Sequence, residues 1–72
     1  MKNGMIQYGV CGYRSSGERV YYVNTPTQGE NLIPYAASLA RKFDTKAAAK
    51  KQMDYCAAKW GGIVGWTVFQ DI

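Results

Sequence analysis

The side chains that most often carry out chemistry in proteins are scarce in this sequence. The chain has no histidine, and its two cysteines, Cys11 and Cys56, have no base beside them. Without an imidazole, neither a Ser-His nor a Cys-His pair can form, and the chain lacks the side chain that most often carries out general acid or base catalysis near neutral pH. The carboxylates are scattered along the chain, at Glu18, Glu30, Asp44, Asp54 and Asp71. We therefore expect a binding protein with no catalytic residue, no metal site and no cofactor.

The cysteines also bear on the compartment. Cys11 and Cys56 lack the close paired spacing of a zinc site or of a small secreted disulfide scaffold. Two buried free thiols are the default expectation, although a single disulfide bridge is arithmetically possible. Residues 1–4 carry no apolar signal-peptide core, and no stretch approaches a membrane-spanning length. We expect the protein to work in the reducing cytoplasm of a host cell, with no membrane partner.

Positive charge gathers in one part of the chain. Nine Lys and Arg residues oppose five Asp and Glu, which gives a net charge of +4. Five basic residues follow one another with Asp44 as the one acid among them: Arg41, Lys42, Lys46, Lys50 and Lys51. This basic ridge suits an acidic partner such as nucleic acid or an acidic protein patch, although a merely solvated helix face explains it equally well.

Aromatic residues supply a second candidate surface. The chain has two Trp, six Tyr and two Phe, and a protein this small buries only about 60% of its unfolded surface. Some of these rings should therefore lie at a working surface. On a sheet face that no helix covers, two tyrosines would stand beside two arginines, and such a combination suits protein hot spots or base stacking. The candidates are Tyr13, Tyr21, Arg14 and Arg19, with Tyr8 and Tyr22 replacing the tyrosines in the opposite register.

Tyr55 is a third kind of candidate, because it falls on the flank of a predicted helix between Lys51 and Lys59. It either lies under the aliphatic stems of these lysines or anchors a partner.

The elements that must position these residues begin with a hairpin. Residues 5–13 alternate in a manner typical of a strand, residues 14–18 have turn composition, and residues 19–23 are β-branched and aromatic. The two runs should pair as an antiparallel hairpin. Residues 63–70 alternate again and predict a final strand.

A helix over residues 46–60 is the clearest element. Thr45 is a suitable N-cap, the segment is rich in alanine and lysine, and Gly61 and Gly62 end it. One apolar stripe should cover the sheet, formed by Ala49, Met53, Cys56, Ala57 and Trp60. The opposite side carries Lys50, Lys51, Asp54, Ala58 and Lys59.

Two segments are harder to interpret. Residues 24–34 have loop chemistry with two prolines, and we expect an irregular excursion there. Residues 34–43 fit either a short helix over 35–41 or an extended segment over 40–43, of which we favour the second. Together these elements predict an α+β fold: one domain over residues 1–72, with an antiparallel sheet of three to four strands and one helix on one face, in β-β-α-β order.

The segment from Ser38 to Ala49 resembles a pattern found among very small phage-encoded proteins, in which an Ala-Arg-x-Phe-Asp/Ser-Thr sequence leads into the only helix. Here that sequence is Ala40-Arg41-Lys42-Phe43-Asp44-Thr45, with a tyrosine-rich hairpin before it and Gly-Gly and a strand after it. In size and in having a small sheet with a single helix, the chain is similar to several anti-CRISPR proteins. These act as stoichiometric inhibitors of a host nuclease complex, some by occupying its nucleic-acid groove.

The resemblance implies a phage or mobile-element protein that binds a host protein or ribonucleoprotein complex of the defence type. Two alternatives stay open. One is direct nucleic-acid binding through the basic ridge, and the other is a sponge that captures a signalling nucleotide, ranked third because one small core has little room for an enclosed pocket. The sequence leaves the oligomeric state open.

Overall fold

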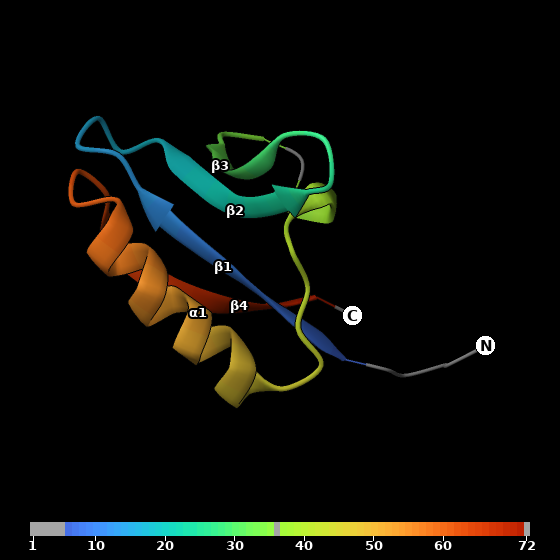
Figure 1. Cartoon of the computed structure of the whole chain (residues 1–72). Helices are drawn as coiled ribbons and strands as arrows, with labels where there is room; N and C mark the ends of the chain where they lie inside the picture. The colour runs from blue at the N-terminus through green and yellow to red at the C-terminus, as the bar shows by residue number, and fades with distance from the viewer. Residues whose placement is uncertain (1–5, 36, 72) are drawn as a thin grey trace.

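The computed structural model describes residues 6–35 and 37–71. Four antiparallel strands form one sheet in the order β3-β2-β1-β4, and the helix α1 (Lys46–Lys59) packs against β1 and β4 (Figure 1). The strands are β1 (Gln7–Tyr13), β2 (Arg19–Thr25), β3 (Gly29–Ile33) and β4 (Val64–Asp71). The α+β class with an antiparallel sheet and one helix on one face is confirmed. The element order contains one strand more than predicted, β-β-β-α-β.

The first two strands form the predicted hairpin. Cys11 pairs with Tyr21, and Tyr13 pairs with Arg19. In the turn, the Gly17 amide donates to the Arg14 carbonyl at 2.8 Å, and Gly17 has a φ of 93°, a value that favours glycine. β2 runs two residues further than predicted. The predicted first residue of the first strand, Met5, lies outside the described residues.

The third strand corrects the sequence interpretation. Residues 24–34 were expected to be irregular, but β2 turns at residues 26–28 and returns as β3, with Tyr22 opposite Leu32 and Thr25 opposite Gly29. The amide of Gln28 donates to Thr25 Oγ1 at 3.1 Å and closes the turn. β3 is an edge strand with Leu32 as its one buried residue, so its polar composition resembles that of a loop.

A short extended segment lies between β1 and β2 where these strands separate. Tyr8 and Phe43 exchange both backbone hydrogen bonds, at 2.9 and 2.8 Å, and the Arg41 amide donates to the Tyr22 carbonyl at 2.9 Å. A 3₁₀ turn, η1 (Ala37–Leu39), precedes this segment. The extended option is therefore confirmed at Phe43. The part of the short-helix option that falls on Ala36 lies outside the described residues.

The helix begins as the sequence predicts, since Thr45 Oγ1 accepts a hydrogen bond from the Ala48 amide at 3.1 Å. Ala49 and Cys56 are buried against the sheet, and Met53 and Trp60 pack partly against the same core. Ala57 is exposed, so its assignment to the stripe was wrong. It falls at the border of the stripe, where a methyl group is too short to reach the sheet.

The core lies between α1 and one face of the sheet. Its strand residues are Val10, Val20, Tyr22 and Leu32, together with Ile63 just before β4. Cys11 and Cys56 are free and buried, as expected. No helix in the described part of the chain is long and apolar enough to cross a membrane. Residues 6–35 and 37–71 also contain no cluster of three or more side chains suited to a metal ion.

Candidate binding surface on the open face of the sheet

The strand register decides which tyrosines lie away from the helix. Tyr8 and Tyr22 pack with the core under α1. Tyr13 and Tyr21 alternate with these residues along β1 and β2, and they share the opposite face with their cross-strand partners. We call this the aromatic face and define it by Tyr13, Arg19, Tyr21 and Phe69. Of the two registers that the sequence left open, the structure has the one with Tyr13 and Tyr21 on the open face.

Arg19 and Tyr13 form a fixed pair at one end of the aromatic face. Arg19 Nε and Nη2 donate to the Tyr13 hydroxyl at 3.0 and 2.8 Å. The guanidinium carbon lies 5.4 Å from the centroid of the Tyr13 ring, within range of a cation–π contact. Arg19 is exposed, and the Tyr13 hydroxyl fixes the orientation of its guanidinium.

Tyr21 and Phe69 form the second pair. Their ring centroids are 5.5 Å apart, and the rings meet edge to face at 78°. The distal end of the Phe69 ring lies over Gly9, where an added Cβ would come within 2.4 Å of Phe69 Cζ. A side chain at position 9 would therefore displace the Phe69 ring from its place beside β1. Both rings are half-buried.

Cys11 shows how closely the side chains of this face pack. It pairs with Tyr21 on one side and Thr67 on the other, and it is only 1% exposed although α1 packs on the other face. Burial raises the pKa of the Cys11 thiol, an effect that the positive charge of Arg19 partly offsets. The thiol is thus protonated and shielded, and the aromatic face forms a small apolar cluster of its own.

The basic ridge is not one surface. Lys42 Nζ donates to the carbonyls of Ala37 and Ala40 at 3.0 and 3.2 Å and pairs with Asp71 at 3.2 Å. Its side chain is only 14% exposed. Arg41 lies over the Phe43 ring, at 5.5 Å from the centroid. Lys42 therefore ties the loop before α1 to the end of β4, a role that the sequence did not reveal.

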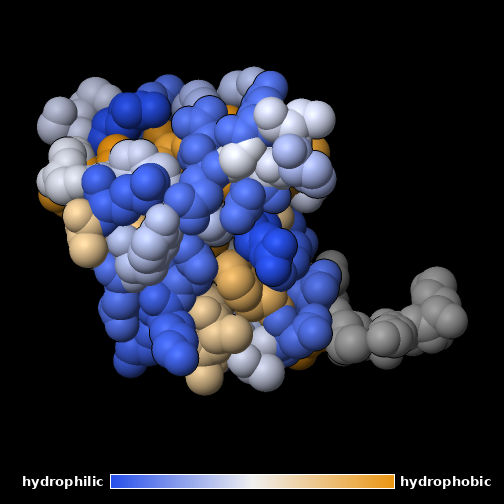
Figure 2. Space-filling model, viewed as in Figure 1, coloured by the Kyte–Doolittle hydropathy of each residue, from blue (hydrophilic) through white to orange (hydrophobic). Residues whose placement is uncertain are grey.

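The helix lysines divide between two directions. Lys46 and Lys50 line a shallow groove of about 270 Å³ between α1 and β4, with Met53, Trp66, Thr67 and Val68. Lys51 is exposed and does not line this groove. Figure 2 shows hydrophilic colours over most of the helix surface, with a band of apolar colour beside it. Lys46 and Lys50 therefore lie together at one groove, whereas Lys42 is bound to carbonyl groups of the loop before α1.

Tyr55 belongs to a network centred on Glu30, which sequence reasoning missed. The Tyr55 hydroxyl donates to Glu30 Oε1 at 2.8 Å, and the Tyr22 hydroxyl donates to Glu30 Oε2 at 2.9 Å. Lys59 adds an ion pair at 3.6 Å. The hydrogen bonds from Tyr55 and Tyr22 lower the pKa of Glu30, and burial, followed by the bond to Glu30, raises the pKa of Tyr22 to about 12.

This network joins α1 to the edge strand β3. The sequence does not predict β3, and without this strand Glu30 looks like a solvated acid in a loop. The network around Glu30 could therefore not be predicted. Tyr55 nevertheless remains 46% exposed.

Arg14 does not stand with the tyrosines of the aromatic face. It lies in the turn between β1 and β2, where its Nε is 3.0 Å from Glu18 Oε1. The structure therefore brings together three of the four predicted face residues, Tyr13, Tyr21 and Arg19. It adds Phe69, whose position opposite Gly9 depends on the register of the last strand.

Comparison of the chain with family models, with curated proteins and with solved structures finds no match. The resemblance in the segment from Ser38 to Ala49 stays an expectation.

Proposed function

We propose that this protein acts stoichiometrically by binding, and that the aromatic face docks on a protein surface of a host protein or ribonucleoprotein complex. The observation that supports this most strongly is the Arg19–Tyr13 pair, held by two hydrogen bonds beside the packed Tyr21–Phe69 pair. Tyrosine and arginine are the residue types that most often dominate the energy of protein interfaces.

The fixed geometry of the face favours binding. Ordering a flexible side chain at an interface costs about 0.5–1.5 kcal/mol. Arg19 is already oriented by the Tyr13 hydroxyl, and Phe69 is already seated over Gly9. Less of that cost remains when a partner binds. The guanidinium would face a carboxylate of the partner, and the rings would cover an apolar patch around it.

The same geometry favours a protein over a single-stranded nucleic acid. Sequence-tolerant nucleic-acid binding uses successive ring faces on which bases stack. Tyr21 and Phe69 meet at 78°, so the two rings cannot both lie flat beneath consecutive bases. Lys42, a member of the basic ridge, is already paired with Asp71 and with loop carbonyls.

The sequence resemblance supports a proposal for the class of host complex that the protein binds. The anti-CRISPR proteins that the chain resembles in size and helix content inhibit host nuclease complexes by stoichiometric binding. We therefore propose a phage or mobile-element inhibitor of a CRISPR-type, nucleic-acid-targeting complex in the host cytoplasm.

The test is affinity capture of the tagged chain from a nuclease-treated host lysate, followed by mass spectrometry, with three versions of the protein. Wild type and the control Lys51→Glu should recover the same complex in stoichiometric amount, whereas Arg19→Glu should lose it. Arg19→Glu and Lys51→Glu make the same charge change at exposed positions of opposite sides. Loss with Lys51→Glu and retention with Arg19→Glu would contradict the proposal, as would unchanged phage survival on defended hosts that express the chain.

Direct nucleic-acid binding remains a second candidate because Lys46 and Lys50 line one groove beside the Trp66 side chain. It is tested by fluorescence anisotropy with labelled single- and double-stranded oligonucleotides. If the protein binds nucleic acid, its affinity for the oligonucleotides should fall steeply as the salt concentration rises. The double variant Lys46→Gln/Lys50→Gln should bind the oligonucleotides more weakly than wild type, whereas Lys51→Gln should bind them equally well. Absence of binding at low salt eliminates it.

A further inference from the structure

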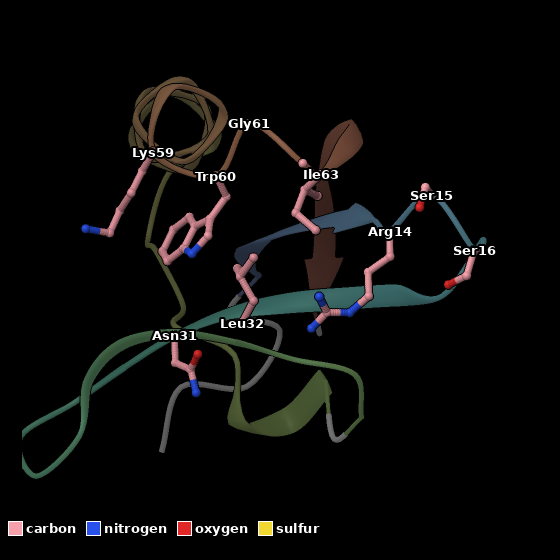
Figure 3. A pocket seen from close by; sticks show the side chains of 10 residues that line it. Arg14, Ser15, Ser16, Asn31, Leu32, Lys59, Trp60, Gly61 and Ile63 are labelled. Atoms are coloured by element: carbon pink, nitrogen blue, oxygen red, sulfur yellow. The ribbon is translucent and has the colours of Figure 1, made fainter.

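A second hollow lies on the helix side of the sheet, away from the aromatic face. It is a groove of about 630 Å³ between the end of α1, the edge strand β3 and the turn between β1 and β2 (Figure 3). Small-molecule sites usually measure about 300–1,000 Å³. The groove is open on one side, so the fold accommodates a ligand-sized space without the enclosed pocket that a small core would not allow.

The inner wall of the groove is apolar. Leu32 and Ile63 are each 8% exposed, and the half-buried Trp60 ring stands beside them. The Trp60 ring meets the buried Tyr22 ring edge to face, with ring centroids 6.1 Å apart and an angle of 63°. The Lys59 ammonium lies 5.5 Å from the Trp60 ring centroid and is paired with Glu30. The wall is thus a fixed indole beside two aliphatic side chains.

The outer rim carries a cation. Arg14 reaches from the turn toward Leu32 (Figure 3), and its Nε is bound to Glu18. A guanidinium has five N–H donors, and the Nη groups of Arg14 make no hydrogen bond with the described residues. Its side chain is 45% exposed. Ser15 and Ser16 lie on the rim beside it.

Another part of the rim is formed by Gly61 and Gly62, which have no side chains. A Cβ added to Gly61 or Gly62 would meet no atom within 4 Å, so the mouth of the groove is open at this loop. A ligand could therefore approach the backbone of the loop directly.

We propose that this groove binds a small molecule that joins a planar ring to an anionic group, with the ring against Trp60 and Leu32 and the anion on the free donors of Arg14. A planar ring matches the indole and aliphatic wall. A phosphate or a carboxylate matches the forked guanidinium. The site is independent of the aromatic face, so the two proposals fail separately.

The test uses the chain's two tryptophans as internal reporters in a ¹⁵N NMR titration. AMP supplies a ring with a phosphate, and indole-3-acetate supplies a ring with a carboxylate, so the two arms distinguish the sources of the anion. Adenosine and inorganic phosphate are the half-ligand controls. We expect AMP or indole-3-acetate to shift the Trp60 indole resonance in a saturable way, leaving Trp66, in the other groove, unchanged. No saturable shift at Trp60 with either ligand overturns the proposal.

The matched variants are Arg14→Gln and Arg41→Gln, both exposed arginines. Arg14→Gln should lower the affinity for AMP about tenfold, to the affinity that the protein has for adenosine, which lacks the anion. Arg41→Gln should leave the affinity for AMP unchanged. Equal affinity of wild type for AMP and adenosine, or an equal effect of both variants, overturns the role of the anion.

Discussion

The two faces of the sheet bury a cysteine by different means. Cys56 is shielded on the inner face by the helix that carries it and by the sheet. Cys11 is almost as inaccessible on the outer face, where it lies between its cross-strand partners Tyr21 and Thr67. The inner face depends on a covering element, while the outer face depends on cross-strand side-chain pairs. An uncovered face can therefore be organised without belonging to the main core.

The largest expected difference between the faces concerns two adjacent tyrosines. Tyr22 is 2% exposed in the core, whereas Tyr21 is half-buried on the aromatic face. Tyr22→Ala should lower the free energy of unfolding by about 3–5 kcal/mol, and Tyr21→Ala by about 1 kcal/mol. Urea denaturation of both variants measures this difference, and equal losses would show that the faces do not differ in this way.

Two glycines of β1 allow the same comparison of the faces by adding a methyl group instead of removing a side chain. A Cβ at Gly12 would come within 2.6 Å of Ile63 Cγ2 on the inner face, and a Cβ at Gly9 would press on Phe69 on the outer face. Ile63 is buried and cannot yield, while Phe69 can swing toward solvent. Gly12→Ala should cost about 2 kcal/mol and Gly9→Ala about 1 kcal/mol. Thermal unfolding of both variants tests whether Gly12→Ala destabilises the protein more than Gly9→Ala. A larger loss of stability in Gly9→Ala would contradict this prediction.

Thiol accessibility separates the two means of burial. Both thiols have a pKa raised by burial, so both should react slowly in the native protein. Phe69→Ala removes one of the rings of the outer face and should speed alkylation of Cys11 several-fold without affecting Cys56. Peptide mapping after timed iodoacetamide treatment identifies the modified thiol. Equal acceleration at Cys56 would indicate general unfolding instead.

The smallest expected effect is the pH dependence contributed by Glu30, which links α1 to β3. Its pKa lies below the ordinary 4.5 because the folded state favours the carboxylate. Its stabilising contribution is therefore present above about pH 4.5 and is lost as pH falls through the lowered pKa. Glu30→Gln should flatten this part of the acid limb in a stability profile. The control Asp54→Asn, at an exposed helix position, should retain it, and an unchanged profile for Glu30→Gln would contradict the assignment.

The elements that the sequence predicts well are those with local signals. Thr45, the alanine-rich run after it and Gly61-Gly62 specify the helix almost to the residue. The hairpin follows from a polar turn between two apolar runs. β3 has no such signal, because an edge strand with one buried side chain does not need apolar alternation. Its pairing is determined by the turn after Thr25, which the two prolines of the segment obscured.

The candidate site depends on tertiary register, which explains why it was only partly predicted. The sequence named Tyr13, Tyr21 and Arg19 as one of two possible sets, and the strand pairing selects between them. Phe69 belongs to the aromatic face because it lies opposite Gly9 in the sheet. This pairing cannot be predicted from the sequence of one strand alone. The basic ridge divides because Lys42 finds loop carbonyls and Asp71, contacts made only after folding.

The most direct test of the account is hydroxyl-radical footprinting of the chain alone and bound to its captured partner. Docking through the aromatic face predicts strong protection of Tyr13, Tyr21 and Phe69 in the complex. Tyr35 and Tyr55, which are 64% and 46% exposed, serve as internal controls and should be oxidised at the same rate in both states. Protection of Tyr55 with unchanged oxidation of Tyr13, Tyr21 and Phe69 would contradict the central claim.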